Sequence, residues 1–261
     1  MVTEAFAYAG YVLPVPRPLA HHGPFYLTLL ALLNERLAPR SYFEIGTHTG
    51  ESLSVFSCDA VCVDPEFELR ERPTGARGRT LLYQMTADDY FANQDLRRDF
   101  PDGPDICFLD GMHHAEFLLR DFINTERYCH AGSLILLHDC LPTTLRMADR
   151  RRFVDETEAL ATRHLWTGDV WRVIRALRRH RPDLTVRMFN CPPSGLIAIT
   201  GLDPRSAVLA QHYQTIVEEM LAESLSDIGL HAVWQTYPLI DTVAATLRAA
   251  TLPAMFPGLR R

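Results

Sequence analysis

The stretch YFEIGTHTGESL, residues 42–53, predicts a strand, a sharp glycine turn and a short helix. Backbone amides at such a helix start can bind an anionic or polar ligand group. The turn does not match the G-x-G-x-x-G pattern of dinucleotide-binding sites, because His48 and Glu51 stand at its second and third glycine positions. The pattern present is instead E-x-G-x-x-x-G, formed by Glu44, Gly46 and Gly50.

Apolar runs of strand length recur on both sides of this turn, and segments with helical spacing lie between them. The runs are residues 41–46, 60–64, 81–85, 105–110 and 133–139. Strands that are apolar along their length and alternate with helices indicate a parallel sheet covered by helices on both faces. Two further runs, 185–190 and 195–200, predict a closing hairpin. The chain is therefore expected to have an α/β fold.

The ends of the chain differ from this central region. We expect three parts, which are residues 1–40, 41–203 and 204–261. The first is an arm with His21 and His22, followed by a helix at about 24–37, and we expect it to act as a lid or as a dimer contact. The last is a helical extension with an apolar tail, which indicates either a homodimer contact or a second layer on the sheet.

The composition argues against several classes of protein. A net charge of −6 without a basic patch argues against a nucleic-acid partner. The longest apolar stretch, FYLTLLALL, is too short to cross a membrane, and MVTEAF lacks the basic start of a signal peptide. Six cysteines without a C-x-x-C pair indicate reduced thiols and a cytoplasmic location. The absence of lysine fits a GC-rich bacterial genome and leaves histidine as the natural general base.

The glycine turn resembles motif I of the class I S-adenosylmethionine-dependent methyltransferases. That resemblance implies a Rossmann-like fold with a mostly parallel seven-stranded sheet. It also implies that Asp64, at the end of the next strand, binds the ribose hydroxyls of the cofactor and that Thr86 lies near its adenine. The residues implied at the methionine end are Glu44, Gly46, Thr47, Gly50 and Ser52.

A second stretch, FLDGMHHAEFLLRDF at 108–122, places an acid and two histidines directly after a strand. Asp110 and Asp139 end successive parallel strands, so both should face the ligand crevice. The D-G-x-H pattern resembles the metal-dependent O-methyltransferases that act on catechols and on macrolide sugars. The resemblance implies that Asp110 contacts the cofactor and the metal, and that His113 is the general base, with His114 as the alternative.

The resemblance also implies a metal site, with Asp110 and Asp139 as ligands of Mg²⁺ or Mn²⁺. The chain departs from the pattern at the third ligand, because His138 stands where the sugar enzymes carry an acid and Cys140 where the catechol enzymes carry an amide. A set of Asp110, His138 and Asp139 suits manganese, iron or zinc better than magnesium. Other readings of these residues are a helix cap for either histidine of the motif and a turn role for Asp139.

The region after the fifth strand, residues 141–183, is where we expect the acceptor to bind. Trp166 and Trp171 could stack on a ring, and Asp169 could bind hydroxyls or an amine. Alternatively, Thr167 or Asp169 is only the N-cap of the following helix and both tryptophans belong to the core. The expected function is methylation of a hydroxyl on a sugar or other secondary metabolite.

Three rival functions remain open at this stage. The first is N-methylation of an amino sugar. The second is a non-haem iron oxygenase with His113, His138 and Asp139 as ligands. The third is cofactor binding without catalysis.

Overall fold

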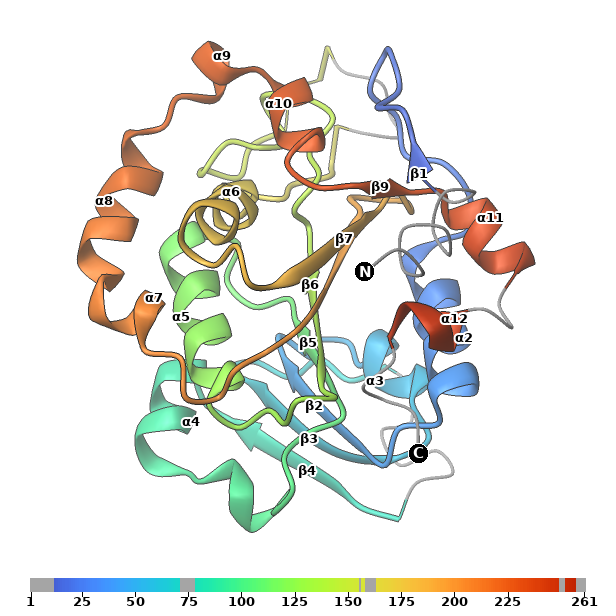
Figure 1. Ribbon diagram of the computed structural model, residues 1–261, viewed down its shortest axis with the longest axis vertical. Helices are drawn as coiled ribbons and strands as arrows, with labels where there is room; N and C mark the ends of the chain where they lie inside the picture. Colours follow the sequence, from blue (N-terminus) through green and yellow to red (C-terminus); the bar gives the residue numbers. More distant parts are fainter. Residues whose placement is uncertain (1–11, 71–77, 155, 158–162, 249–251, 257–261) are drawn as a thin grey trace.

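A nine-stranded sheet runs through the protein in the order β1-β9-β7-β8-β6-β5-β2-β3-β4 (Figure 1). The computed structural model describes residues 12–70, 78–154, 156–157, 163–248 and 252–256. The strands are β1 Val12–Leu13, β2 Ser41–Ile45, β3 Asp59–Asp64, β4 Thr80–Gln84, β5 Ile106–Leu109, β6 Leu134–His138, β7 Thr185–Phe189, β8 Leu196–Thr200 and β9 Leu239–Ile240. Residues 1–11 of the predicted arm, and 249–251 and 257–261 of the predicted extension, lie outside the described residues.

Most neighbouring strands in the sheet are parallel, as predicted. β2 pairs in parallel with β3 and β5, and β4 and β6 continue the parallel region on either side. β8 is antiparallel to both β6 and β7, which confirms the predicted hairpin. The strands from β7 to β4 are the seven of the predicted sheet, so the Rossmann-like α/β fold class is confirmed.

The expected strand number of seven was too low, because β1 and β9 extend the sheet at the β7 edge. β9 pairs in parallel with β7, matching Met188 with Leu239, and β1 pairs antiparallel with β9, matching Val12 with Ile240. Each of these strands has two residues, which is too few to show an alternating pattern in the sequence. Both protect an edge that would otherwise expose unpaired backbone groups.

Helices cover both faces of the sheet, with α5 and α6 on one side and α2 and α3 on the other (Figure 1). The helices are α2 Tyr26–Leu37, α3 Glu51–Val55, α4 Ala87–Asn93, α5 Ala115–Glu126, α6 Trp171–His180, α7 Val208–Gln211, α8 Tyr213–Ala222, α9 Leu225–Ile228, α10 Leu230–Trp234, α11 Thr242–Leu247 and α12 Leu252–Met255, with a 3₁₀ turn at Leu96–Arg98. Among the described residues, none of these helices combines the length and apolar character needed to span a bilayer.

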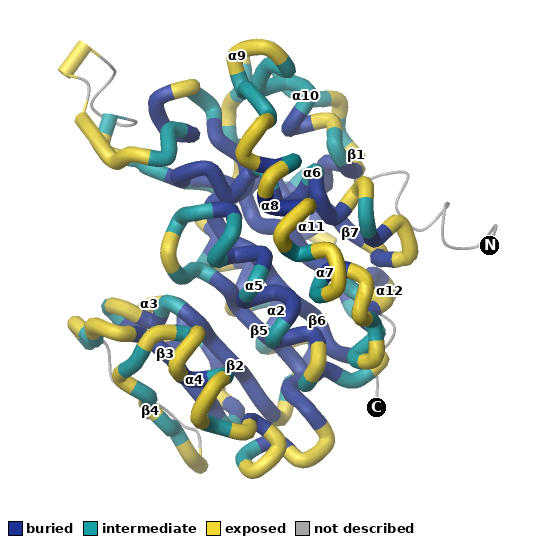
Figure 2. The backbone as a smooth tube through the Cα atoms, turned by 90° about the vertical axis from the view of Figure 1, so that its left-hand side faces the viewer, coloured by how far each residue is buried: buried dark blue, intermediate teal, exposed yellow. Residues whose placement is uncertain are grey.

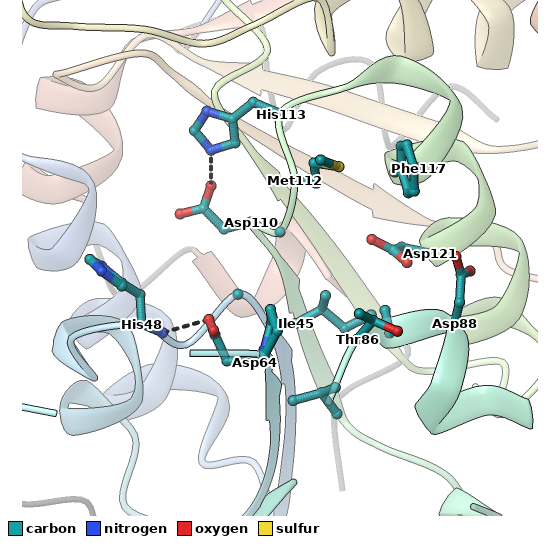
Figure 3. Close-up of a pocket in the computed structure, with 15 residues that line it drawn as sticks. Ile45, His48, Asp64, Thr86, Asp88, Asp110, Met112, His113, Phe117 and Asp121 are labelled. Carbon is teal, nitrogen blue, oxygen red and sulfur yellow. Dashed lines mark hydrogen bonds and ion pairs between the residues drawn. The ribbon is translucent and has the colours of Figure 1, made fainter. Parts of the chain in front are cut away.

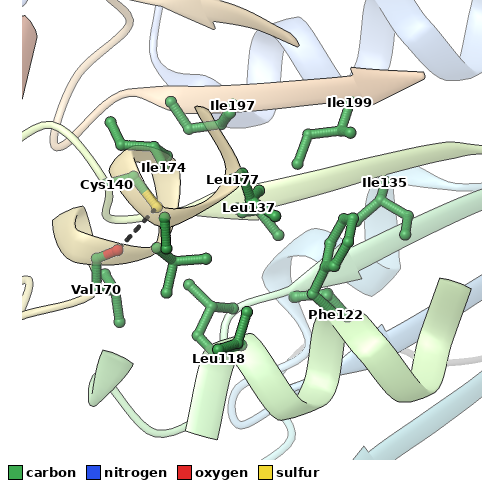
Figure 4. Packing of buried hydrophobic residues seen from close by; sticks show 14 of the residues in the cluster. Leu118, Phe122, Ile135, Leu137, Cys140, Val170, Ile174, Leu177, Ile197 and Ile199 are labelled. Carbon is green, nitrogen blue, oxygen red and sulfur yellow. Dashed lines mark hydrogen bonds between the residues drawn. The ribbon is translucent and has the colours of Figure 1, made fainter. Parts of the chain in front are cut away.

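Alternate residues of the central strands enter two different hydrophobic cores. Phe43 and Ile45 pack on the side of α5 and α6, whereas Tyr42 packs on the side of α2. Figure 4 shows the first core, where Leu118 and Phe122 of α5 meet side chains of β6, β8 and α6. Because both faces are covered, β2, β5 and β6 are buried along their whole length (Figure 2). This burial explains the apolar runs, and the parallel pairing of β2 to β6 places the carboxyl ends of these strands at one edge.

Candidate active site

Two cavities open at the carboxyl ends of the parallel strands, where loops after β2, β3, β5 and β6 converge. The large cavity has a volume of about 600 Å³, and Figure 3 shows its lining side chains. The small cavity has a volume of about 350 Å³. Asp110 and His113 line both. These two residues therefore form a wall that the cavities share.

Gly46 allows the loop after β2 to touch the loop after β5. Its φ of +87° is a conformation that side chains other than glycine rarely adopt. A Cβ atom at this position would lie 2.0 Å from the carbonyl oxygen of Asp110. The glycine is therefore required both by the backbone conformation and by the close approach, and its backbone lines the large cavity.

Asp64 lies at the end of β3 on the wall of the large cavity. Its Oδ2 accepts a hydrogen bond from the His48 amide at 2.8 Å, and its Oδ1 accepts one from the Glu66 amide at 2.7 Å (Figure 3 shows the first). A carboxylate has about four acceptor positions, so two remain for hydroxyl groups of a ligand. Asp64 thus fixes the glycine loop and can also bind a diol.

Glu44, Thr47 and Ser52 lie beneath the glycine loop rather than on the cavity wall. The Glu44 carboxylate is fully buried and accepts hydrogen bonds from the hydroxyls of Tyr42 at 3.1 Å, Thr47 at 3.0 Å and Ser52. Burial raises the pKa of Glu44 to about 7, although these hydrogen bonds oppose the shift. The structure therefore gives these three side chains a supporting position under the loop.

The remaining predicted residues of this half of the site are Gly50 and Thr86. Gly50, with a φ of +80°, is the N-cap of α3 and faces Leu69. Thr86 lines the large cavity and caps α4, since its Oγ1 accepts a hydrogen bond from the Asp89 amide at 3.1 Å. Asp121, which we had not assigned to the site, also lines the cavity, and burial raises its pKa to about 7.

Two histidines and two aspartates form a compact cluster on the shared wall. His113 Nε2 lies 3.4 Å from Asp110 Oδ1 and 3.1 Å from Asp139 Oδ2. His138 Nδ1 lies 3.2 Å from Asp110 Oδ2 and 3.4 Å from Asp139 Oδ1. Each imidazole thus faces both carboxylates, and the prediction that the ends of β5 and β6 face each other is confirmed.

The cluster shifts the pKa values of its members in opposite directions. Burial alone would lower the pKa of His113, but Asp139 and Asp110 raise it to about 9. Burial is likewise outweighed at His138, whose pKa rises to about 10 beside the same two carboxylates. Burial would raise the pKa of Asp139, yet the imidazoles of His138 and His113 hold it well below its usual range. Asp139 also has a φ of +58°, which is strained for a residue other than glycine.

The donor atoms of this cluster fit a divalent metal ion. One atom each from Asp110, His113 and Asp139 lies within 4.8 Å of the others. Asp110 Oδ1 and His138 Nδ1 are buried at ion-pair distance from their neighbours but form no well-aligned hydrogen bond to any described residue. Two carboxylate oxygens and one imidazole nitrogen suit manganese, iron or zinc. This set contains His113, whereas the sequence had pointed to His138.

Of the predicted acceptor residues, Trp166 lines the small cavity. Its ring lies 5.0 Å from the His113 ring, and its Nε1 donates a hydrogen bond to the Asp149 carbonyl at 2.7 Å. Asp169 and Trp171 line neither cavity. Asp169 accepts a hydrogen bond from the Ala115 amide at 2.9 Å, at the start of α5. Trp171 is buried in the core, which is the alternative interpretation of this residue.

His114 also lies outside both cavities. Its Nε2 is 3.3 Å from the Arg150 carbonyl oxygen, and its Nδ1 is 3.3 Å from an Arg150 nitrogen. The guanidinium of Arg150 in turn pairs with Glu116 and Asp169. His114 therefore belongs to a polar network at the start of α5.

Several lining residues of the small cavity were not predicted individually, although Met147, Arg152, His164 and Leu165 lie in the predicted acceptor region 141–183. Tyr26, at the start of α2, packs against His138, with 4.2 Å between the two ring centroids. The unpredicted lining residues are Phe25, Tyr26, Met147, Arg152, His164, Leu165, Pro193 and Ser194. The one available hint was the aromatic pair FY directly after Pro24. The other residues come from segments that meet only in the folded chain.

Comparison with known proteins finds a match to one family model, over part of the chain. Residues 43–140 match the family model described as a methyltransferase domain. No curated protein matches the chain. Among solved structures, it resembles the O-methyltransferase TomG from Streptomyces achromogenes in complex with SAM, with 16% identity, a TM-score of 0.47, and coverage of 67% of this chain and 78% of that one.

A second similar structure is the O-methyltransferase from Bacillus cereus in complex with SAH. The identity is 15% and the TM-score 0.47, with coverage of 76% of this chain and 86% of that one. The family match covers residues 43–140, from β2 to the residue after Asp139, and is the basis of the proposal below.

Proposed function

Because residues 43–140 match the family model of a methyltransferase domain, we propose that the chain transfers the methyl group of S-adenosylmethionine to a hydroxyl group of a small molecule. The family match confirms the predicted class of enzyme, an S-adenosylmethionine-dependent methyltransferase. The acceptor and the roles of individual residues are part of the proposal.

The observation that carries the proposal is the shared wall of the two cavities. Methyl transfer is an in-line displacement, so donor and acceptor must approach each other from opposite sides of one point. Asp110 and His113 stand at such a point, between a large cavity beside the glycine loop and a small cavity with an aromatic lining. We assign the large one as the cofactor cavity and the small one as the acceptor cavity.

In the cofactor cavity, the Asp64 carboxylate is suited to the ribose hydroxyls and Thr86 to the adenine side. Asp110 lines the same space, as do Asp88, which pairs with Arg120, and Asp121, whose raised pKa of about 7 leaves it partly protonated at neutral pH. An acidic lining complements a cofactor that carries a positively charged sulfonium.

His113 is the proposed general base for the acceptor hydroxyl. Asp110 and Asp139 orient its ring and stabilise the positive charge that it gains with the proton. With a pKa of about 9, the base form is the minor one at neutral pH. We therefore expect the rate of methyl transfer to rise as the pH increases toward 9.

A metal ion would be held by Asp110, His113 and Asp139, and in that state His113 would be a ligand and could not act as the general base. When bound, the metal ion would lower the pKa of an acceptor hydroxyl. The imidazole ligand favours Mn²⁺ over Mg²⁺. An oxygenase would need two histidines and one carboxylate, and the ligand group found here has the reverse composition, so that alternative is not favoured. An amino group of an amino sugar remains an alternative acceptor atom.

Calorimetric titration of S-adenosylmethionine and S-adenosylhomocysteine into EDTA-treated protein tests the proposal. We expect both to bind without metal, and Asp64→Asn to weaken both. Turnover with a panel of hydroxylated aromatic compounds and sugars should fall by about 10² to 10⁴ in His113→Gln, with cofactor affinity unchanged. His114→Gln, at the position next in sequence but outside both cavities, should retain turnover. Absence of cofactor binding under all conditions would refute the proposal.

A further inference from the structure

Arg152 places an unpaired positive charge on the wall of the acceptor cavity. It forms no hydrogen bond or ion pair with any residue that the structure describes. Its neighbours in sequence differ, since Arg150 pairs with Glu116 and Asp169, and Arg151 lies 3.8 Å from the Asp149 carboxylate. Arg152 is thus the member of this arginine run whose charge is left for a ligand.

The carboxylates of the same cavity do not balance that charge. Asp110 and Asp139 each have two imidazole partners within 3.4 Å and no ion pair with Arg152. His164 is the remaining polar side chain that residues 141–183 contribute beside Arg152. Its Nε2 accepts a hydrogen bond from Arg163 at 3.2 Å. That bond leaves the ring proton on Nδ1, so His164 adds a donor rather than an acceptor.

The rest of the lining is aromatic or apolar. Phe25, Tyr26 and Trp166 supply rings, and the aliphatic or thioether part comes from Met147, Leu165 and Pro193. Such a surface favours a flat ring, because aromatic groups gain by stacking and edge contacts in addition to burial. At about 350 Å³, the cavity is near the lower limit for small-molecule sites, which favours a compact acceptor.

We propose that the acceptor is a hydroxylated aromatic acid, with its carboxylate bound by Arg152, its ring against the aromatic lining and its hydroxyl at His113. The guanidinium fork matches a carboxylate with two parallel hydrogen bonds, which gives orientation as well as affinity. This inference rests on the proposed function and narrows it to a substrate class other than the sugars that the resemblance suggested.

The test compares an acid with its uncharged counterpart on the complete enzyme. The protein is first titrated with S-adenosylhomocysteine and then, when saturated, with 3,4-dihydroxybenzoate or 3,4-dihydroxybenzamide. We expect the acid to bind at least about tenfold more tightly than the amide, and high salt to narrow the difference. Arg152→Gln should abolish the preference. Arg151→Gln, whose side chain is 89% exposed and outside the cavity, should keep it.

Each other outcome has a definite meaning. Equal binding of acid and amide, or no binding of the acid by the cofactor-saturated protein, would overturn the aromatic-acid assignment and leave the methyltransferase proposal standing. If Arg152→Gln weakened S-adenosylhomocysteine instead, the arginine would serve the carboxylate of the cofactor, and the assignment would again be wrong. Failure of S-adenosylhomocysteine to bind any variant would overturn both proposals.

Discussion

The cofactor cavity and the acceptor cavity meet at one wall but are built differently. Most of the cofactor cavity comes from turns that directly follow β2, β3, β4 and β5, so most lining residues are close in sequence to a strand end. The acceptor cavity combines the start of α2, the long segment 141–183 after β6 and the connection between β7 and β8. Their charges differ too, with Asp64, Asp88 and Asp121 in the first and Arg152 in the second. Local sequence thus defines the donor site, and tertiary packing defines the acceptor site.

The largest effect on stability and on cofactor binding should come from a substitution of Gly46, which lines the cofactor cavity. Gly46→Ala would place a Cβ atom 2.0 Å from the Asp110 carbonyl oxygen in a backbone conformation of φ +87°. We expect a loss of at least about 4 kcal/mol in the free energy of unfolding, because the two loops must separate. Urea unfolding and S-adenosylhomocysteine titration measure the two consequences.

Gly229→Ala is the matched control for this change. Gly229 has a similar φ of +77°, but a Cβ atom there would meet nothing within 4 Å. The loss in the free energy of unfolding should be limited to backbone strain of about 1–3 kcal/mol, with cofactor affinity unchanged. Equal losses in the free energy of unfolding of the two variants would show that the contact between the loops after β2 and β5 contributes nothing to stability.

A smaller effect on stability should come from Glu44, which supports the glycine loop but does not line the cofactor cavity. Glu44 has a folded-state pKa of about 7 against an ordinary value of 4.5, so the folded protein binds the proton more tightly than the unfolded chain. The stabilisation from this proton is complete below about pH 4.5 and is lost as the pH rises through about 7. The shift corresponds to about 3 kcal/mol.

Glu44→Gln should remove this pH dependence and make the protein relatively more stable at pH 8. The measurement is urea unfolding of the variant and of the native protein between pH 5 and pH 8. Glu35→Gln, on an exposed carboxylate of α2, serves as the control and should leave the slope unchanged. A Glu44→Gln variant with the native slope would mean that Glu44 is ionised throughout this range.

The strands of the central sheet could be predicted because burial on both faces leaves a continuous apolar run in the sequence. The glycine turn was recognisable for a related reason, since a positive φ at Gly46 restricts the residue type. The two-residue strands β1 and β9 could not be predicted, because their pairing depends on where the ends of the chain return to the β7 edge.

The site was predictable mainly where residues follow a strand end, with Trp166 of the acceptor cavity as the exception. Asp64, Asp110 and Asp139 lie at the expected edge because parallel strands end together. Trp171 and Asp169 were assigned by residue type alone, and that evidence did not reveal that one fills the core and the other caps α5. Phe25 and Tyr26 lie more than a hundred residues from the other unpredicted lining residues in the sequence, so their place in the cavity depends on tertiary contacts.

The smallest effect should appear on the acceptor side, at Trp166. Trp166→Ala removes the indole from the acceptor cavity, and we expect about a tenfold loss in affinity for 3,4-dihydroxybenzoate with the affinity for S-adenosylhomocysteine unchanged. Trp166→Phe keeps an aromatic ring but loses the hydrogen bond from Nε1 to the Asp149 carbonyl, so its loss should be smaller if stacking dominates. An equal loss of affinity in both variants would mean that the hydrogen bond from Trp166 to the Asp149 carbonyl, and not stacking, supports acceptor binding. A parallel loss of cofactor affinity would show that the shared wall does not separate the two cavities, because a change confined to the acceptor lining would then have reached the donor site.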